Sequence, residues 1–191
     1  MCYSFCEQLH IVFKQRYVSR GSQEMNVKQD LEAYFCANPV FFFRSIAKKK
    51  NWEIVAEEND STAFYAEGIW RQYLCWFQWI EADQQLRITC EYDLKLPKNR
   101  RNSLYRTLNL ANEKCEEGFF TYCDQQNIIV FHSKFKGLDA LEISSLRSQE
   151  IIEDITNIMD ELYPVFQLIS WGKESPDMAM RLASNHISGF I

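Results

Sequence analysis

Residues 62–95 decide the fold, and they read TAFYAEGIWRQYLCWFQWIEADQQLRITCEYDLK. The pattern predicts three successive β-strands, over residues 62–69, 73–81 and 85–95. In the last of these strands apolar residues alternate with polar or charged ones. Successive side chains of a strand point to opposite faces, so this strand has one buried side and one side in water. The residues expected on its buried side are Leu86, Ile88, Cys90, Tyr92 and Leu94.

The middle strand carries large apolar side chains on both of its faces. One face holds Leu74, Trp76 and Ile80, and the other holds Tyr73, Cys75, Phe77 and Trp79. We therefore expect both sides of the sheet to be covered at this strand, by helices or by a second chain. The pattern favours an α+β domain that binds protein, and it indicates no particular reaction.

The remaining elements can be read from turn and capping residues. Asn38-Pro39 has the residues of a helix start, and Ser175-Pro176 is a second such start, which opens the last helix. The expected elements are a helix from 38 to about 51, a strand over 52–57, a helix over 98–117 ended by Gly118, a hairpin of strands 119–124 and 128–134, a long helix from 144 or 145 to 171 that contains Pro164, and a last helix from 176 to about 186.

The length of 191 residues fits one domain and an appendage. We expect a single α+β domain over residues 38–187 and an N-terminal arm over residues 1–37. Within the arm, residues 1–24 are expected to be either a loosely held segment or an over-extended gene start, because Met25 begins a more ordinary N-terminus.

Composition weighs against several classes of function. The formal net charge is −5 and the basic residues are scattered, which gives no support to nucleic-acid binding. The longest apolar runs fall short of the ~18 residues that a membrane helix needs. The seven cysteines include no CxxC pair, a usage typical of a reducing cytoplasm.

No arrangement of residues predicts catalysis, a metal site or a cofactor. His10, His132 and His186 lie in three unrelated segments, and the six glycines form no phosphate-binding loop. His132 is expected to be a structural or surface histidine. Adjacent acidic residues point in different directions on a helix or strand. We therefore interpret five acidic pairs as turns or solvated faces: Glu57-Glu58, Glu81 with Asp83, Glu116-Glu117, Glu153-Asp154 and Asp160-Glu161.

The aromatic residues leave more than one interpretation open. Packing between helices and sheet would account for most of them. In a sharper hypothesis, Tyr73, Phe77 and Trp79 form an exposed surface for a partner or for a dimer. The same face could equally be covered by the C-terminal helix of the chain itself. In a third hypothesis, Trp70, Trp76 and Phe166 line a pocket for a small molecule between helices and sheet.

Three separated motifs resemble the YbjN family. The first is EGIWRQY at 67–73 with FQW at 77–79. The second is YDLKLP at 92–97, leading into Arg100-Arg101 and LNLANE at 108–113. The third is YPVFQ at 163–167, with WGK at 171–173 and Ser175-Pro176. In order and spacing the resemblance covers roughly residues 38–185 and leaves out the first 37.

The resemblance implies a fold like that of the type III secretion chaperones, with helices on one face of a curved antiparallel sheet and common dimerisation. Members of the family are described as bacterial sensory-transduction or stress regulators without known enzymatic activity, so no catalytic residues carry over. The leading hypothesis is a cytoplasmic, dimeric, non-enzymatic regulator that binds another protein. The alternatives are a chaperone-like protein that holds extended client segments and the small-molecule sensor.

Overall fold

The computed structural model describes residues 38–136 and 145–187. The expected arm over residues 1–37 lies outside the described residues. The described elements, in chain order, are α3 (Val40–Lys49), β1 (Ile54–Glu57), β2 (Ser61–Glu67), β3 (Gln72–Ile80), a 3₁₀ turn η1 (Glu81–Asp83), β4 (Gln85–Tyr92), a second 3₁₀ turn η2 (Lys98–Arg100), α4 (Arg101–Asn112), β5 (Phe119–Cys123), β6 (Ile128–Lys136), α5 (Ser145–Trp171) and α6 (Pro176–Ile187).

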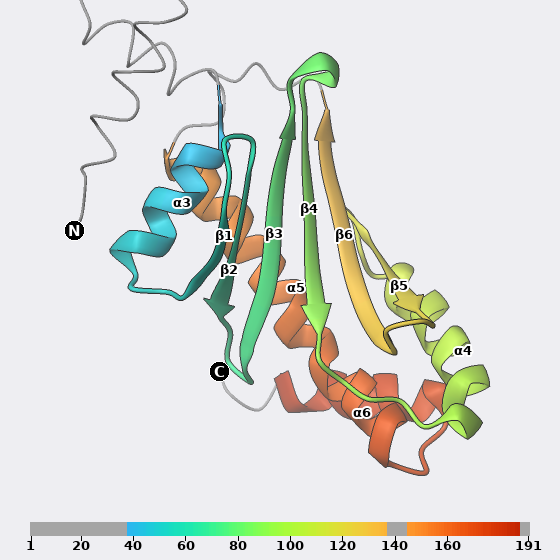
Figure 1. The fold of residues 1–191 in the computed structure, drawn as a ribbon. Coiled ribbons are helices and arrows are strands. Elements are labelled where there is room, and N and C mark those ends of the chain that lie inside the picture. The colour runs from blue at the N-terminus through green and yellow to red at the C-terminus, as the bar shows by residue number, and fades with distance from the viewer. Residues whose placement is uncertain (1–37, 137–144, 188–191) are drawn as a thin grey trace, which may run out of the picture. The chain divides into compact units, whose positions relative to one another are not determined.

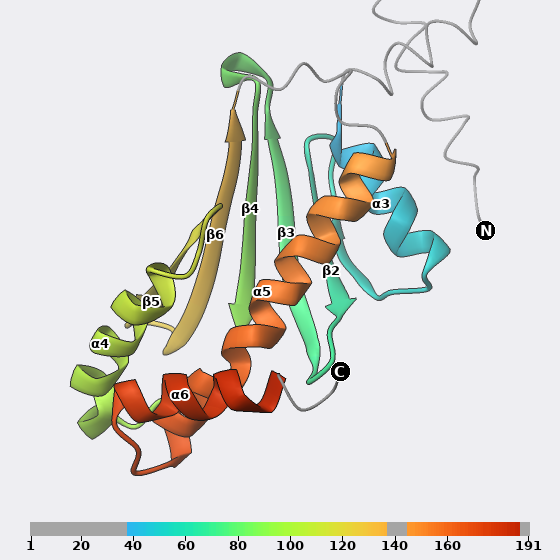
Figure 2. The same cartoon turned by 180° about the vertical axis from the view of Figure 1, so that it is seen from behind.

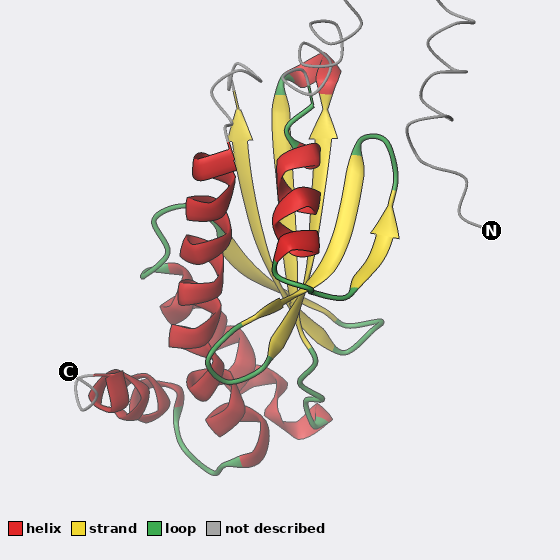
Figure 3. Ribbon diagram, turned by 90° about the vertical axis from the view of Figure 1, so that its left-hand side faces the viewer, coloured by secondary structure: helices red, strands yellow, loops and turns green. Residues whose placement is uncertain are grey.

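The described strands form one six-stranded sheet in the order β1-β2-β3-β4-β6-β5, and all neighbours are antiparallel. Figures 1 and 2 show α5 crossing one face of this sheet, with α3 beside it over β1 and β2. α6 packs against α4 and α5 at one end of the sheet. Figure 3 shows the curvature of the strands from the side. The prediction of an α+β fold, with helices packed on one face of a curved antiparallel sheet, is confirmed.

The core lies between the sheet and the helices. The apolar side of β4 faces it as predicted, because Leu86, Ile88, Cys90 and Tyr92 are all buried. On α5 an apolar stripe at helical spacing packs against these residues; Ile151, Ile155, Met159, Leu162, Phe166 and Ile169 form it and are buried. Among the described residues, no helix combines the length and apolar content that a membrane span requires.

The expected partner surface of Tyr73, Phe77 and Trp79 is wrong, because all three side chains are buried inside this chain. The ring of Phe77 stacks between Phe43 of α3, at 4.3 Å between centroids, and Phe64 of β2, at 5.0 Å. Antiparallel pairing sets these β3 residues beside the buried side of β4, with Phe77 opposite Ile88 and Trp79 opposite Leu86. The aromatic side of β3 is therefore the core side, covered by α3 and α5.

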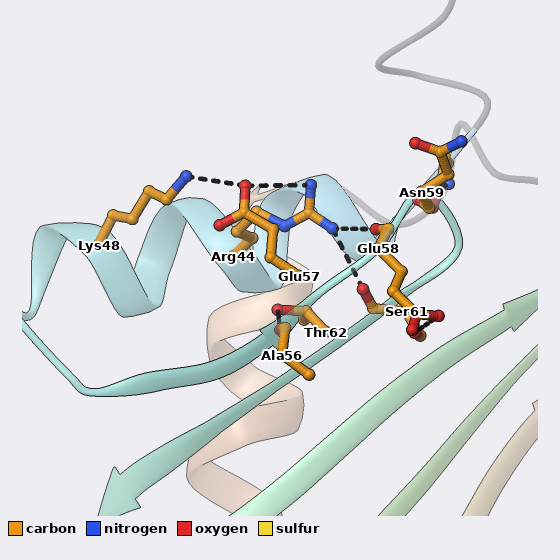
Figure 4. A network of polar contacts seen from close by, with 9 residues as sticks. Arg44, Lys48, Ala56, Glu57, Glu58, Asn59, Ser61 and Thr62 are labelled. Carbon is orange, nitrogen blue, oxygen red and sulfur yellow. Dashed lines mark hydrogen bonds and ion pairs between the residues drawn. The ribbon is translucent and has the colours of Figure 1, made fainter. Parts of the chain in front are cut away.

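A buried arginine attaches α3 to the sheet (Figure 4). The guanidinium of Arg44 donates to the backbone carbonyls of Glu58 and Ser61, in the turn between β1 and β2. Its other nitrogen lies 3.6 Å from the carboxylate of Glu57, which also pairs with Lys48. A buried arginine needs such partners, since an unpaired buried charge is strongly unfavourable. The contacts fix α3 over β1 and β2.

The helix expected over 98–117 is shorter than predicted. It starts with the 3₁₀ turn η2 and ends at Asn112, whose side chain bonds to both backbone groups of Phe120 in β5. Gly118 does not cap this helix. It leads into β5 with a φ of 145°, where a Cβ atom would lie 2.6 Å from the carbonyl oxygen of His132.

Candidate functional site

One face of the sheet has no described helix over it, and we call it the open face (Figure 1). The strand register arranges its side chains in three rows across the sheet. The upper row is Ser61, Gln78, Arg87 and Lys134; the middle row is Ala63, Trp76, Thr89, His132 and Phe119; the lower row is Tyr65, Leu74, Glu91, Val130 and Thr121. We expected both sides of β3 to be covered, by helices or by a second chain; no described helix covers the open face, and a cover by a second chain stays a prediction.

The middle row gives the open face an aromatic centre. Trp76 is 39% exposed and Phe119 is 46% exposed. The Phe119 ring stacks on the imidazole of His132, with 5.1 Å between the ring centroids. His132 also contacts the Thr121 hydroxyl at 2.8 Å, and burial lowers the pKa of its imidazole. His132 is a structural histidine, as predicted, in a row that exposes apolar rings to solvent.

The lower row contains a partly buried carboxylate. Glu91 lies between Leu74 and Val130 on the neighbouring strands. Burial raises the pKa of this carboxyl group above its ordinary value. A groove of about 430 Å³ runs past it, lined by Tyr65, Arg71, Gln72, Leu74, Glu91, Asp93, Lys95, Gln126 and Ile128. A surface groove that contains a titratable group with a shifted pKa is a common feature of binding sites.

The upper row is basic. Arg87 on β4 lies directly opposite Lys134 on β6, and Lys136 follows on the same face. All three side chains are exposed. Like charges placed opposite each other on neighbouring strands destabilise a sheet. Within residues 38–136 and 145–187, no carboxylate forms an ion pair with any of the three. A negatively charged group next to the upper row would therefore offset the repulsion between these three cations.

The turn between β2 and β3 is held by Asp160 of α5. This carboxylate accepts hydrogen bonds from the backbone N–H groups of Ile69, at 2.7 Å, and Trp70, at 3.3 Å. It also accepts one from the hydroxyl of Tyr73, at 2.5 Å. Burial and this contact with Asp160 raise the pKa of Tyr73, so the phenol stays protonated and acts as the donor. The indole N–H of Trp70 donates to the carbonyl oxygen of Asp160 at 3.0 Å.

Gly68 is part of the same arrangement. A Cβ atom at this position would lie 2.3 Å from the Tyr73 ring and 2.7 Å from the Asp160 carboxylate. The backbone can therefore approach α5 only with glycine here. The turn is thus fixed rigidly to α5 while Ile69, 83% exposed, points into solvent. The first motif of the resemblance, residues 67–73, contributes this anchor.

Asp160 corrects the interpretation of the acidic pairs. Its side chain is buried, whereas Glu161 beside it is partly exposed and pairs with Lys114. The sequence contained one signal for the burial of Asp160, because this residue directly follows Met159 of the apolar stripe on α5. A carboxylate at the edge of a buried stripe needs donors, and the turn that supplies them lies 90 residues away in the sequence.

The structure separates the three residues expected to line one pocket. Phe166 is fully buried on the core side, where its ring contacts Tyr92 and Phe120. Trp76 lies on the open face, on the opposite side of the sheet. Trp70 is half exposed in the turn on Asp160. These three side chains do not share a cavity.

The features that the described residues offer are contact surfaces. Among these residues, no three His, Cys, Asp or Glu side chains gather in a way that could hold a metal ion. The open face combines exposed aromatic rings, a basic row and a shallow groove. These features suit binding of a protein surface or segment.

Comparison with known families gives one result. The family model YbjN, described as "putative bacterial sensory transduction regulator", matches residues 43–167, well over half of the chain. No curated protein matches the chain with significance, and no solved structure does so either. The matched range includes the anchored turn, the open face and Asp160. This chain belongs to the YbjN family.

Proposed function

We propose that this chain is a non-enzymatic cytoplasmic regulator that acts by binding another protein through the open face. The observation that supports the proposal is the middle row, where Trp76 and Phe119 remain exposed on a sheet face without a described helix. Water-exposed aromatic rings at the centre of a sheet gain the most free energy when a partner covers them. The family description supports a regulatory role.

The chemistry of the face also favours one kind of partner segment. The aromatic centre suits apolar side chains, and the basic upper row of Arg87 and Lys134 suits carboxylates beside them. The first occupant to test is a second copy of this chain, because the lower row carries the carboxylate of Glu91 in its groove. Asp93 of the same groove already pairs with Arg71 and Lys95. In a two-fold arrangement the basic row of one copy would meet Glu91 of the other.

The two alternative hypotheses receive less support. A chaperone that adds a client strand to its sheet needs a long free edge. The edges here are β1, four residues long with a register shift, and β5, five residues long. Short or irregular edges are how proteins discourage strand addition. The small-molecule sensor loses its expected pocket, because Trp70, Trp76 and Phe166 lie apart.

Light scattering on the full chain over a range of concentrations tests self-association. We expect a dimer in the wild-type protein and a monomer in Trp76→Ala. The matched control is Trp171→Ala, since Trp171 is 70% exposed at the end of α5 and away from the sheet. A wild-type protein that stays monomeric at every concentration would contradict the homodimer.

Photo-crosslinking in bacterial cells tests the open face for any protein partner. A photoreactive amino acid replaces Gln78, which is exposed in the upper row and leaves Trp76 in place. The control position is Tyr105 on α4, which is also exposed. We expect a covalent adduct of defined mass from position 78 only, at twice the chain mass for a dimer. If neither a dimer nor another protein is captured at position 78, the open face is not the binding surface.

A further inference from the structure

Two cysteines face each other in the core, on neighbouring strands. Cys75 of β3 lies directly opposite Cys90 of β4, and both are buried. Their Sγ atoms are 2.7 Å apart. Unbonded heavy atoms prefer a separation of roughly 3.5–4.0 Å, and a disulfide bond is about 2.05 Å long. The two sulfurs would therefore have to approach by only roughly 0.7 Å to bond.

The backbone geometry also fits a disulfide. Directly opposed residues of an antiparallel pair have Cα atoms about 4.5–5.5 Å apart. Disulfides span Cα separations of about 4.4–6.8 Å, so the strands need no rearrangement. Both residues are free thiols here, and the Cys90 S–H donates to the Cys75 sulfur.

From this juxtaposition we infer that Cys75 and Cys90 are a site of covalent oxidation, at which hydrogen peroxide converts the two thiols into an intrachain disulfide. In the first step the Cys75 sulfur attacks the peroxide O–O bond, giving a sulfenic acid and one water molecule. In the second step the Cys90 sulfur attacks this sulfur, an S–S bond forms, and a second water leaves. The balance is two thiols and one peroxide to one disulfide and two waters.

The site is specific to this pair among the four cysteines described. The Cys115 thiol, just past the end of α4, donates to the carbonyl oxygen of Ala111 on that helix, and burial raises the pKa of this thiol to about 11. Cys123 lies on the edge strand β5, opposite Ile128. Burial also raises the pKa of Cys90, so reaction of the pair is slow compared with an exposed thiolate. The inference does not depend on the proposed protein binding.

The oxidised pair would lie directly beneath the open face. Cys75 and Cys90 are adjacent in sequence to Trp76 and Thr89, which are themselves opposite each other in the middle row. The bond would lock the register of β3 against β4 at that point. Peroxide would thus change the covalent structure of the sheet directly beneath the open face. A regulator can respond to peroxide through such a change.

Peptide mapping of the full-length protein tests the inference. Trypsin cleaves after Arg71, Arg87 and Lys95, so the two cysteines fall in separate peptides, residues 72–87 and 88–95. The folded protein is treated with hydrogen peroxide, free thiols are alkylated, and the digest is analysed by mass spectrometry without reductant. We expect the two peptides linked, at a summed mass lower by two hydrogen atoms, and separated again by reductant. Recovery of both peptides unlinked, with alkylated or over-oxidised cysteines, overturns the inference.

A second pair of variants distinguishes direct reaction from exchange with another cysteine. Cys115→Ser and Cys123→Ser each leave Cys75 and Cys90 in place, and we expect both variants to give the linked peptides in the same yield as wild type. If the link is lost in either variant, the disulfide forms by exchange through that cysteine, and the direct reaction is wrong. A link that forms only when peroxide is added to unfolded protein also overturns the inference.

Discussion

The two faces of β3 differ in what covers them, although both carry aromatic rings. On the core face Phe77 is buried between Phe43 and Phe64. On the open face Trp76, its neighbour in sequence, keeps 39% of its surface exposed. Residue type therefore does not distinguish a core position from an exposed position in this strand. The neighbouring strands and helices decide which face of the strand is covered.

The largest expected effect is on the free energy of unfolding, and it comes from a substitution on the core face of β3. Phe77→Ala removes a fully enclosed ring, and we expect it to lower the free energy of unfolding by about 3–5 kcal/mol. Urea unfolding followed by circular dichroism measures the change. Phe77→Leu keeps much of the volume and is expected to lose less, which allows the position to be tested if the alanine variant does not fold. A loss below about 1 kcal/mol for Phe77→Ala would mean that the site is loosely packed.

The sequence predicted most of the fold because its strands and helices have regular patterns. The alternation of residues 85–95 correctly placed Leu86, Ile88, Cys90 and Tyr92 in the core. It could not decide which face of β3 lies beside them, because this depends on the register of the hairpin. A turn longer or shorter by one residue would have put Trp76 in the core and Phe77 outside. The turn at Glu81–Asp83, followed by Gln84 at a φ of 45°, has no Asn-Gly signal that would have fixed its length.

The next largest effect concerns the anchored turn. Asp160→Asn replaces a carboxylate that accepts three hydrogen bonds with an amide that presents an N–H₂ group to backbone donors. We expect a loss of about 2–3 kcal/mol in the free energy of unfolding, since buried donors are left unpaired. Glu161→Gln is the matched control on the exposed side of α5 and is expected to change stability by less than about 0.5 kcal/mol. Equal effects of the two substitutions would show that Asp160 does not hold the turn.

The candidate site was predicted less well than the fold. The sequence located the aromatic cluster of 70–79 but expected an exposed surface at Tyr73, Phe77 and Trp79, which are buried, and it missed Asp160. Both failures have the same physical origin. The relevant contacts join residues distant in sequence, such as Ile69 with Asp160 and Phe77 with Phe43. No local periodicity reports such a contact.

A smaller effect on stability is expected at the open face. Trp76→Ala removes a ring that no described helix covers, and we expect a loss of about 1 kcal/mol, well below that of Phe77→Ala. The same urea unfolding experiment, carried out at low protein concentration to limit association, measures it. Trp76→Ala distinguishes self-association from folding, because we expect it to abolish the dimer seen by light scattering while it changes stability only slightly. A loss as great as that of Phe77→Ala would place Trp76 in the core.

The smallest effect is a pH dependence from Glu91. Burial raises the pKa of its carboxyl group in the folded protein above the unfolded value. A group with a raised folded pKa contributes stability that is fully present below its unfolded pKa and is lost as the pH rises through the folded pKa. Glu91→Gln should therefore be slightly more stable than wild type at neutral pH, and the difference should shrink as the pH falls to about 4.

Unfolding midpoints in urea between about pH 4 and pH 7 measure this difference in stability. Glu67→Gln makes the same charge change at an exposed residue of β2 and is the matched control. A difference between Glu91→Gln and wild type that does not vary with pH would mean that Glu91 is fully hydrated in the folded protein.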